Sequence, residues 1–386
     1  MKRHLGLPLA ALAAALILLP ACQAGSTTTL TATKTATSTV TATVTATTTA
    51  TATPTDTTTP TPTPETRVIT DMYGRQVTVP TNITRILTTG PVEMQLVFML
   101  APDKLAGLAF TPNGNPPFVS EKYSSLPAVG GWFGTQVGNY ETFIAANPDV
   151  ILEGFEDTLD ERQQKFGNIP VVGINSGDLM FNYAPAIRFL GELLDVQDKA
   201  QELINYYIDA MGYVSSITAS IPYNDRVTVY YAEGQNGLNT DPLGSMHTAL
   251  LAFCGGVNVA DVQLLPGYGM ATVSMEQILL WAPDMIIIGR GSQANLYKAI
   301  MADSLWNQLQ AVKDGQVFVR PDNPFSWFDG PPGPCQIIGM YWMVNLLYPD
   351  ETADLDLGAK IKEYYSKFMH YDLTDTELAF LLAKPS

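Results

Sequence analysis

Side chains that could do catalytic or metal chemistry are few in this chain. It holds three His and three Cys among its 386 residues. That scarcity excludes a disulfide scaffold, a zinc site of paired cysteines and a His-rich site for bare zinc or manganese. The motifs of a serine nucleophile elbow, a zinc protease and a phosphate-binding loop are also absent from the sequence. We therefore predict a protein that is not an enzyme, that has no cofactor, and that meets metal only as a chelate.

The first cysteine has a chemistry of its own. Cys22 follows Leu19-Pro20-Ala21, and before these lies an apolar run over residues 5–19 behind a basic N-terminus. The run is too short to span a membrane and is typical of a signal peptide. Small residues before a lone Cys are typical of a lipoprotein, so we predict a signal peptide over 1–21 and a lipid on Cys22. The alternative is ordinary cleavage near Ala24 and a freely secreted protein.

A low-complexity tract follows the predicted anchor. Thr fills more than half of residues 26–66, which alternate with Ala and Val and end in a Pro-Thr repeat. Such a composition predicts a disordered linker over 22–66 that tethers a folded body to the outer face of the cytoplasmic membrane. A Thr/Pro tract is also a typical substrate for O-glycosylation, so a glycosylated surface adhesion protein is an alternative.

Charge and length narrow the class further. The chain has 21 Lys and Arg against 37 Asp and Glu, a net charge of −16. Binding a phosphate backbone requires Lys and Arg, so a nucleic-acid partner is excluded. The body after the tract is long enough for two lobes, and we expect a monomer.

Short apolar runs alternate with helical ones in both halves of the body, a pattern that predicts an α/β fold with mainly parallel sheets. The first lobe, 67–184, carries expected strands at 68–70, 76–79, 85–89, 105–110, 150–152 and 169–174, and helices at 93–100 and 140–146. One long helix, or two, is expected over 185–221 between the lobes. The second lobe, 222–386, carries expected strands at 227–231, 285–288 and 317–320, helices at 245–254, 274–281 and 336–347, and amphipathic surface helices over 355–382.

The two halves contain the same unit. Residues 139–144 predict a short helix with Glu141 in its first turn, and a Pro-Asp pair and an apolar strand follow. Residues 274–279 repeat this with Glu276. Two lobes built on one unit would face each other across a cleft, which is a preferred place for a ligand.

The ordered set of such stretches resembles the substrate-binding lipoproteins of ABC importers for ferric siderophores, cobalamin and haem. The resemblance covers essentially the whole body and implies two Rossmann-like lobes joined by one long helix, with the ligand cleft between them. No single piece is specific, but their order is. The stretches are 69–75 with 77–80, 85–86, 129–132, 139–141 with 147–149, 255–259 and 274–278.

The resemblance implies that Glu141 and Glu276 dock the protein onto arginines of a permease dimer, which works with its ATPase. Exposed carboxylates suit this role because they pair with guanidinium through two charge-assisted hydrogen bonds. The alternative is that both acids only stabilise the first turns of their helices.

It also implies a ligand site that is rich in aromatic side chains. Trp132 follows two glycines at the position that lines the cleft in the family, and Trp327 and Phe328 lie in a Pro- and Gly-rich loop that would form the opposite wall. Tyr231 and Tyr268 are weaker candidates. Each of these side chains could instead be ordinary core packing.

Polar candidates for the same site are His247, Arg290 and Arg320. A His near this position contacts the metal of the chelate in some relatives, although a lone His is more often a packing residue. Many relatives carry Arg in the loop before the last large helix, and residues 330–335 contain none. Arg290 and Arg320 could substitute for it.

The expected ligand is therefore a neutral or weakly anionic metal chelate. A ferric siderophore comes first, cobalamin or another corrinoid second, and haem or a nickel or cobalt chelate third. Cys335 could face the cleft or be a buried, inert thiol, and a Cys254–Cys335 disulfide would suit an oxidising compartment; the sequence leaves open whether the two thiols are free.

Overall fold

The computed structural model describes residues 65–114, 117–176, 183–264, 270–289 and 293–385. The expected signal peptide, Cys22 and nearly all of the linker lie outside this part, as do Tyr268 and Arg290. By the contacts that residues make with one another, the chain forms two units, residues 1–61 and residues 62–386. All the elements described below belong to the second unit. In the described part, no helix combines the length and the hydropathy that a membrane span requires.

The body opens with an antiparallel hairpin, as expected. Strands β1 (Thr66–Thr70) and β2 (Gln76–Pro80) pair around a turn in which Gly74 has a φ of 81°. The buried carboxylate of Asp71 accepts the backbone N–H groups of Tyr73 and Arg75 and pairs with the Arg75 guanidinium. Only glycine adopts such a φ without strain, so the turn and its Asp cap fix the hairpin together.

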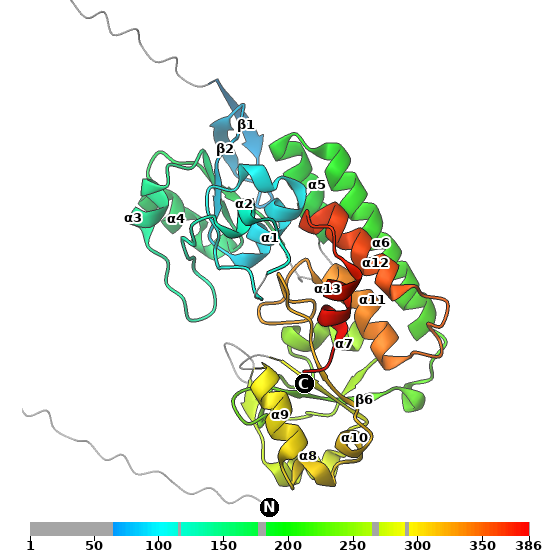
Figure 1. Cartoon of the computed structure of the whole chain (residues 1–386). Coiled ribbons are helices and arrows are strands. Elements are labelled where there is room, and N and C mark those ends of the chain that lie inside the picture. The colour runs from blue at the N-terminus through cyan, green and yellow to red at the C-terminus, as the bar shows by residue number, and fades with distance from the viewer. Residues whose placement is uncertain (1–64, 115–116, 177–182, 265–269, 290–292, 386) are drawn as a thin grey trace, which may run out of the picture. The chain divides into compact units, whose positions relative to one another are not determined.

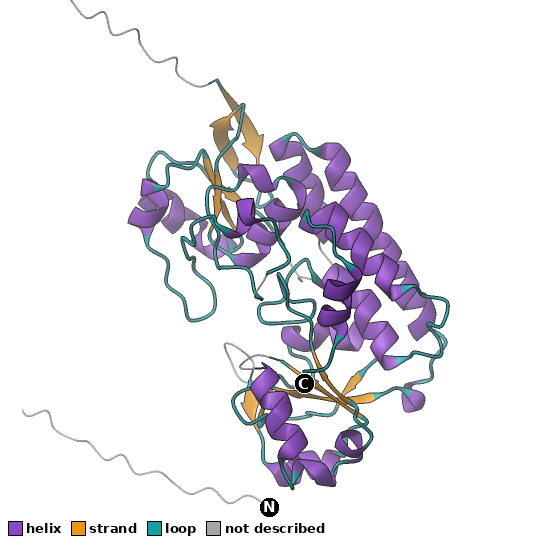
Figure 2. Cartoon of the chain, in the orientation of Figure 1, coloured by secondary structure: helices purple, strands orange, loops and turns teal. Residues whose placement is uncertain are grey.

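The first lobe is built on a parallel sheet in the order β3-β4-β5. All three strands are buried, because helices cover the sheet (Figure 2). The expected strand at 105–110 is wrong: Leu105 and Leu108 form only isolated bridges, to Ile86 and Ala128. The elements of this lobe are β3 (Ile86–Thr88), α1 (Pro91–Leu100), α2 (Glu121–Ser124), α3 (Tyr140–Ala145), β4 (Val150–Glu153), α4 (Leu159–Phe166) and β5 (Val171–Gly173).

Two helices, not one, follow this lobe. Helix α5 (Tyr183–Leu194) ends at Asp195, which has a φ of 59°, and α6 (Gln197–Thr218) starts two residues later. Gly191 lets the pair pack closely, since a Cβ there would lie 2.5 Å from the Cβ of Ala200. Figure 1 shows α6 as the long green helix beside the C-terminal helices.

The second lobe has a parallel sheet in the order β11-β10-β6-β8. A small antiparallel pair, β7 with β9, lies at the carboxyl end of β6. The expected helix at 245–254 is a 3-10 turn over Met246–Thr248 followed by α7. The elements are β6 (Thr228–Ala232), β7 (Asn239–Thr240), α7 (Ala249–Phe253), β8 (Val257–Asn258), β9 (Ala271–Thr272), α8 (Met275–Trp281), β10 (Met285–Ile288), α9 (Gln293–Ala302), α10 (Gln310–Lys313) and β11 (Val317–Val319).

The C-terminal segment returns to the first lobe. It comprises α11 (Gln336–Leu347), α12 (Leu357–Tyr364), a π-helical turn over Tyr365–Met369 and α13 (Asp375–Leu382). His370 Nε2 lies 2.8 Å from the carbonyl oxygen of Phe98 in α1, and Tyr371 stacks on Phe118. The expectation of surface helices is thus wrong for the π-helical turn, where Phe368 is fully buried in the same core as α1.

The α/β class with parallel sheets is confirmed. Short 3-10 turns at 102–104, 156–158, 223–225 and 306–308 complete the described elements.

Candidate functional site

The carboxyl ends of the parallel strands identify the candidate site. In open α/β sheets, ligands bind in crevices beyond these ends. In the first lobe, Thr89 and Gly154 follow β3 and β4. In the second, Glu233 and Gly289 follow β6 and β10, and Arg320 follows β11.

A pocket of about 390 Å³ lies near these ends and takes its walls from both lobes. That volume is within the usual range of small-molecule sites. A larger hollow of about 670 Å³ lies on α6, α11 and α12, away from the strand ends, so we do not take it as the site. The pocket is lined by Phe133, Gly134, Thr135, Gln136, His247, Met270, Gly330 and Pro331.

His247 is the sequence-predicted residue that the structure places in the pocket wall. It lies in the 3-10 turn before α7, where the Ser245 hydroxyl accepts its backbone N–H. Its Nδ1 is 2.5 Å from Oδ1 of Asp329, whose other carboxylate oxygen accepts the hydroxyl of Tyr231 at 3.1 Å. The side chain of Asp329 is fully buried, and that of His247 is 12% exposed.

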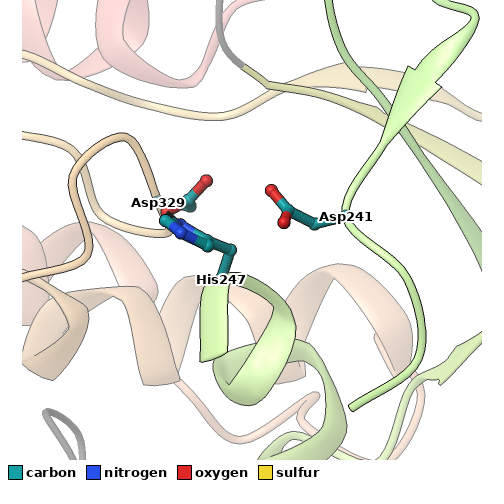
Figure 3. Close-up of side chains that lie close together, drawn as sticks. All are labelled: Asp241, His247 and Asp329. Atoms are coloured by element: carbon teal, nitrogen blue, oxygen red, sulfur yellow. Dashed lines mark hydrogen bonds and ion pairs between the residues drawn. The ribbon is translucent and has the colours of Figure 1, made fainter. Parts of the chain in front are cut away.

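Asp241 completes a group of three possible metal ligands. One donor atom each from Asp241, His247 and Asp329 lie within 4.8 Å of one another. Figure 3 shows the carboxyl groups of Asp241 and Asp329 pointing toward one another, with the imidazole beside Asp329. Asp241 is fully buried and accepts the Ser245 hydroxyl at 2.9 Å. Imidazole and carboxylate together suit a transition metal ion.

Trp132 does not line the pocket. Its ring packs on Tyr140 at 4.7 Å between centroids, and the guanidinium of Arg162 lies 4.1 Å from its ring. Arg162 is itself held by Glu153. This cation–π contact keeps the indole against the first lobe and leaves its neighbour Phe133 in the pocket wall.

Trp327 and Phe328 are fully buried and expose no atom to the pocket. The Trp327 ring packs against Tyr365 of the C-terminal segment, and Phe328 packs against Tyr231. The expectation that this loop presents an aromatic face to the ligand is therefore wrong for this structure. The residues of the loop that do line the pocket are Gly330 and Pro331.

Two more predicted ligand residues are buried in the second lobe. Tyr231 uses its hydroxyl on Asp329 and is fully buried. Arg320 is 4% exposed, and its guanidinium donates to the Ser326 hydroxyl. Neither lines the pocket, although both hold the loop that ends in Asp329.

Glu141 and Glu276 are exposed in the first turns of α3 and α8, one in each lobe. The Asn139 side chain caps α3, and the Ser274 hydroxyl caps α8. Hydrogen bonds from its own backbone N–H and from Ser274 hold the pKa of Glu276 below its usual value. Both acids thus lie exposed at the starts of capped helices.

Sequence reasoning missed Asp241, Asp329, Phe133 and Met270. Asp329 is part of the loop sequence that was singled out, but nothing local says that its partner is His247, 82 positions away. It also missed Glu93 in α1, which is 3% exposed. Burial and the charge of Glu153 raise the pKa of Glu93 to about 7, against hydrogen bonds from its own backbone N–H and from Ser176.

The chain is similar to known proteins over most of its length. Residues 121–324 match the model of a family described as periplasmic binding protein. The chain is 24% identical over 328 residues to the molybdate-binding protein MolA of Haemophilus influenzae, a match that covers 78% of this chain and 90% of MolA.

Solved structures of solute-binding proteins are also similar to this chain over most of its length. The chain is similar to an ABC transporter solute-binding protein from Sulfurospirillum deleyianum, with a TM-score of 0.74 and 30% identity, over 82% of this chain and 98% of that one. It is also similar in fold to MolA bound to molybdate, with a TM-score of 0.64 and 22% identity, over 80% of this chain and 99% of that one.

Proposed function

The chain belongs to the periplasmic binding protein family, and from this premise we propose that the solute it delivers to an ABC importer is a metal chelate. The observation that carries the proposal is His247, which lies in the pocket wall with two buried carboxylates near it. A metal centre is the solute that most needs such donors. A ferric siderophore remains the first candidate, and a nickel or cobalt chelate uses the same donors.

Pocket size separates the other candidates. A volume of about 390 Å³ is at the lower end of the range for ligand sites. Cobalamin, haem and the large siderophores all exceed such a pocket, so each would require the lobes to open further. Among the chelates, a small one therefore fits the pocket best.

A molybdate-like oxyanion is the second candidate, because MolA carries that ligand in its name. Tetrahedral oxyanions are bound by N–H donors and by cations. Here the pocket wall carries His247 with Asp241 and Asp329 beside it, and imidazole and carboxylate oxygens are ligands of a metal ion. We therefore favour the chelate.

Direct binding tests the ligand. We would purify the chain from residue 22 with Cys22→Ala and titrate it calorimetrically with a ferric hydroxamate, a ferric catecholate, nickel–histidine, cobalamin, haem and molybdate. We expect saturable binding of one metal chelate and none of molybdate. Saturation by molybdate alone would replace the proposal with the oxyanion, and no binding to any of the six would refute both.

Delivery is proposed to use Glu141 and Glu276 as docking carboxylates, with Cys22 as the lipid anchor and residues 22–66 as the tether. The double variant Glu141→Ala/Glu276→Ala should keep ligand affinity and lose uptake in cells. Glu121→Ala, which removes an exposed first-turn acid of α2, is the matched control and should leave uptake unchanged. Uptake by the double variant at the parent rate would refute the docking role and revive the adhesion alternative.

A further inference from the structure

We infer that Asp329 is a positioning residue for cargo binding: it holds the imidazole of His247 in the tautomer that offers Nε2 as the donor to a metal in the pocket. The inference rests on the proposed function, since the metal is taken to be that of the cargo. It narrows the cargo to chelates that leave a coordination position of their metal open to an imidazole nitrogen.

The first support is the geometry of the pair. Nδ1 of His247 lies 2.5 Å from Oδ1 of Asp329, within hydrogen-bond distance. Oδ2 of the same carboxylate accepts the Tyr231 hydroxyl at 3.1 Å. An ionised carboxylate can only accept, so Nδ1 carries the proton of the pair. In the neutral ring the lone pair is then on Nε2.

The second support is that both ends of the pair are fixed. The backbone oxygen of Asp329 accepts the Ser326 hydroxyl at 2.5 Å, and that hydroxyl also takes a hydrogen bond from Arg320. On the other side, Ser245 accepts the backbone N–H of His247 and donates to Asp241. The ring is therefore held by contacts from two loops that are far apart in the sequence.

The third support is location. His247 lines the pocket, whereas Asp329 and Tyr231 are fully buried behind it. A carboxylate behind a metal-binding His raises the basicity of the ring and fixes its orientation, and loss of such a partner typically weakens metal binding roughly 10- to 100-fold. Gly330 and Pro331, which follow Asp329, line the same pocket, so one loop supplies both wall and support.

The test uses cobalt(II) as the probe, because its visible spectrum reports nitrogen coordination. The chain from residue 22, with Cys22→Ala, is titrated with Co²⁺ and the absorbance followed. We expect one site that disappears in His247→Ala and weakens roughly 10- to 100-fold in Asp329→Asn. Complete loss of the site in Asp329→Asn, as in His247→Ala, would show that Asp329 is itself a metal ligand and would overturn the positioning role. Tyr231→Phe should cause a smaller loss of affinity, because it removes one hydrogen bond to the carboxylate and leaves the carboxylate in place.

A charge-matched control is available outside the pocket. Tyr213 donates to Asp354 at 3.2 Å, which is a second tyrosine–aspartate pair, and Asp354→Asn should bind Co²⁺ like the parent. Parent-like Co²⁺ binding by Asp329→Asn or by His247→Ala would overturn the inference. Thermal melting verifies that each variant folds. If Asp329→Asn does not fold, the Co²⁺ affinity of Tyr231→Phe tests the inference in its place, and an affinity equal to that of the parent would overturn it.

The two proposals fail in different ways. If a chelate binds the parent but Asp329→Asn binds it and Co²⁺ equally well, the positioning role is wrong and the chelate receptor stands. If Co²⁺ binding depends on His247 and Asp329 while no chelate of the panel binds, the cargo assignment is wrong and the positioning role stands.

Discussion

Replacing Glu93 with Gln should make the protein more stable at neutral and alkaline pH. Glu93 lies in the first turn of α1, 3% exposed, close to Gly154 and Ser176 at the carboxyl edge of the first sheet. Because burial disfavours the carboxylate, the pKa of Glu93 is about 7, against a usual value of 4.5. The folded protein therefore keeps a proton that the unfolded chain loses.

The sign and size follow from linkage. Between pH 4.5 and 7 the folded state binds one proton more than the unfolded state at this group, so the free energy of unfolding falls as pH rises through that window. At about 1.4 kcal/mol per pKa unit, the loss is about 3 kcal/mol when complete. The amide of Gln has nearly the same shape and does not ionise, so Glu93→Gln removes this slope.

The assay is urea unfolding, followed by circular dichroism, of parent and Glu93→Gln at pH 5, 6, 7 and 8. The two should have similar free energies of unfolding at pH 5, and the variant should be the more stable by about 3 kcal/mol at pH 8. Histidine titration affects both proteins and cancels in the difference. Glu156→Gln, at an exposed glutamate, is the control and should follow the parent at every pH. Parallel curves for parent and Glu93→Gln would show that Glu93 is already ionised in the fold and would refute the reasoning.

Three further outcomes are expected. Asn139→Ala removes the acceptor for two N–H groups of α3 and should lower the free energy of unfolding by about 1 kcal/mol in urea titrations, with an unchanged value counting against the cap. Gly339→Ala places a Cβ 1.8 Å from the carbonyl oxygen of Trp327, so the melting temperature should fall steeply, and a parent-like value would contradict this packing. Burial raises the pKa of both Cys254 and Cys335, so a thiol reagent should label neither in the native protein and both in guanidinium; rapid native labelling would contradict their burial.

Features set by a few neighbouring residues could be predicted from the sequence. Helices α3 and α8 were found because an apolar helical run, an acid in its first turn and a following Pro-Asp lie within a dozen positions. Most strands were found because buried parallel strands are short apolar runs. The run at 105–110 is also apolar, but it has no β-branched residue and contains Gly107, and it makes only isolated bridges.

The candidate site depended on contacts that the sequence does not display. Trp132 and Phe133 are adjacent aromatics, and which of them lines the pocket is decided by Arg162, thirty positions away. A loop rich in Pro and Gly is usually exposed, yet Tyr365 covers Trp327. The family resemblance named the loop and the histidine that lie at this pocket, but only the fold shows what each side chain contacts.

The return of the C-terminal segment to α1 sets the order in which the molecule can be completed. His370 reaches the carbonyl oxygen of Phe98 across 272 positions, and the Tyr364 hydroxyl lies 3.7 Å from the sulfur of Met99. When a chain crosses a membrane with its N-terminus leading, α1 emerges early, and the residues that cover α1 emerge almost last. Until then the apolar face of α1 lacks part of its native cover, and contacts between residues so distant in the sequence form slowly. The first lobe is therefore completed only when the C-terminal segment has reached α1.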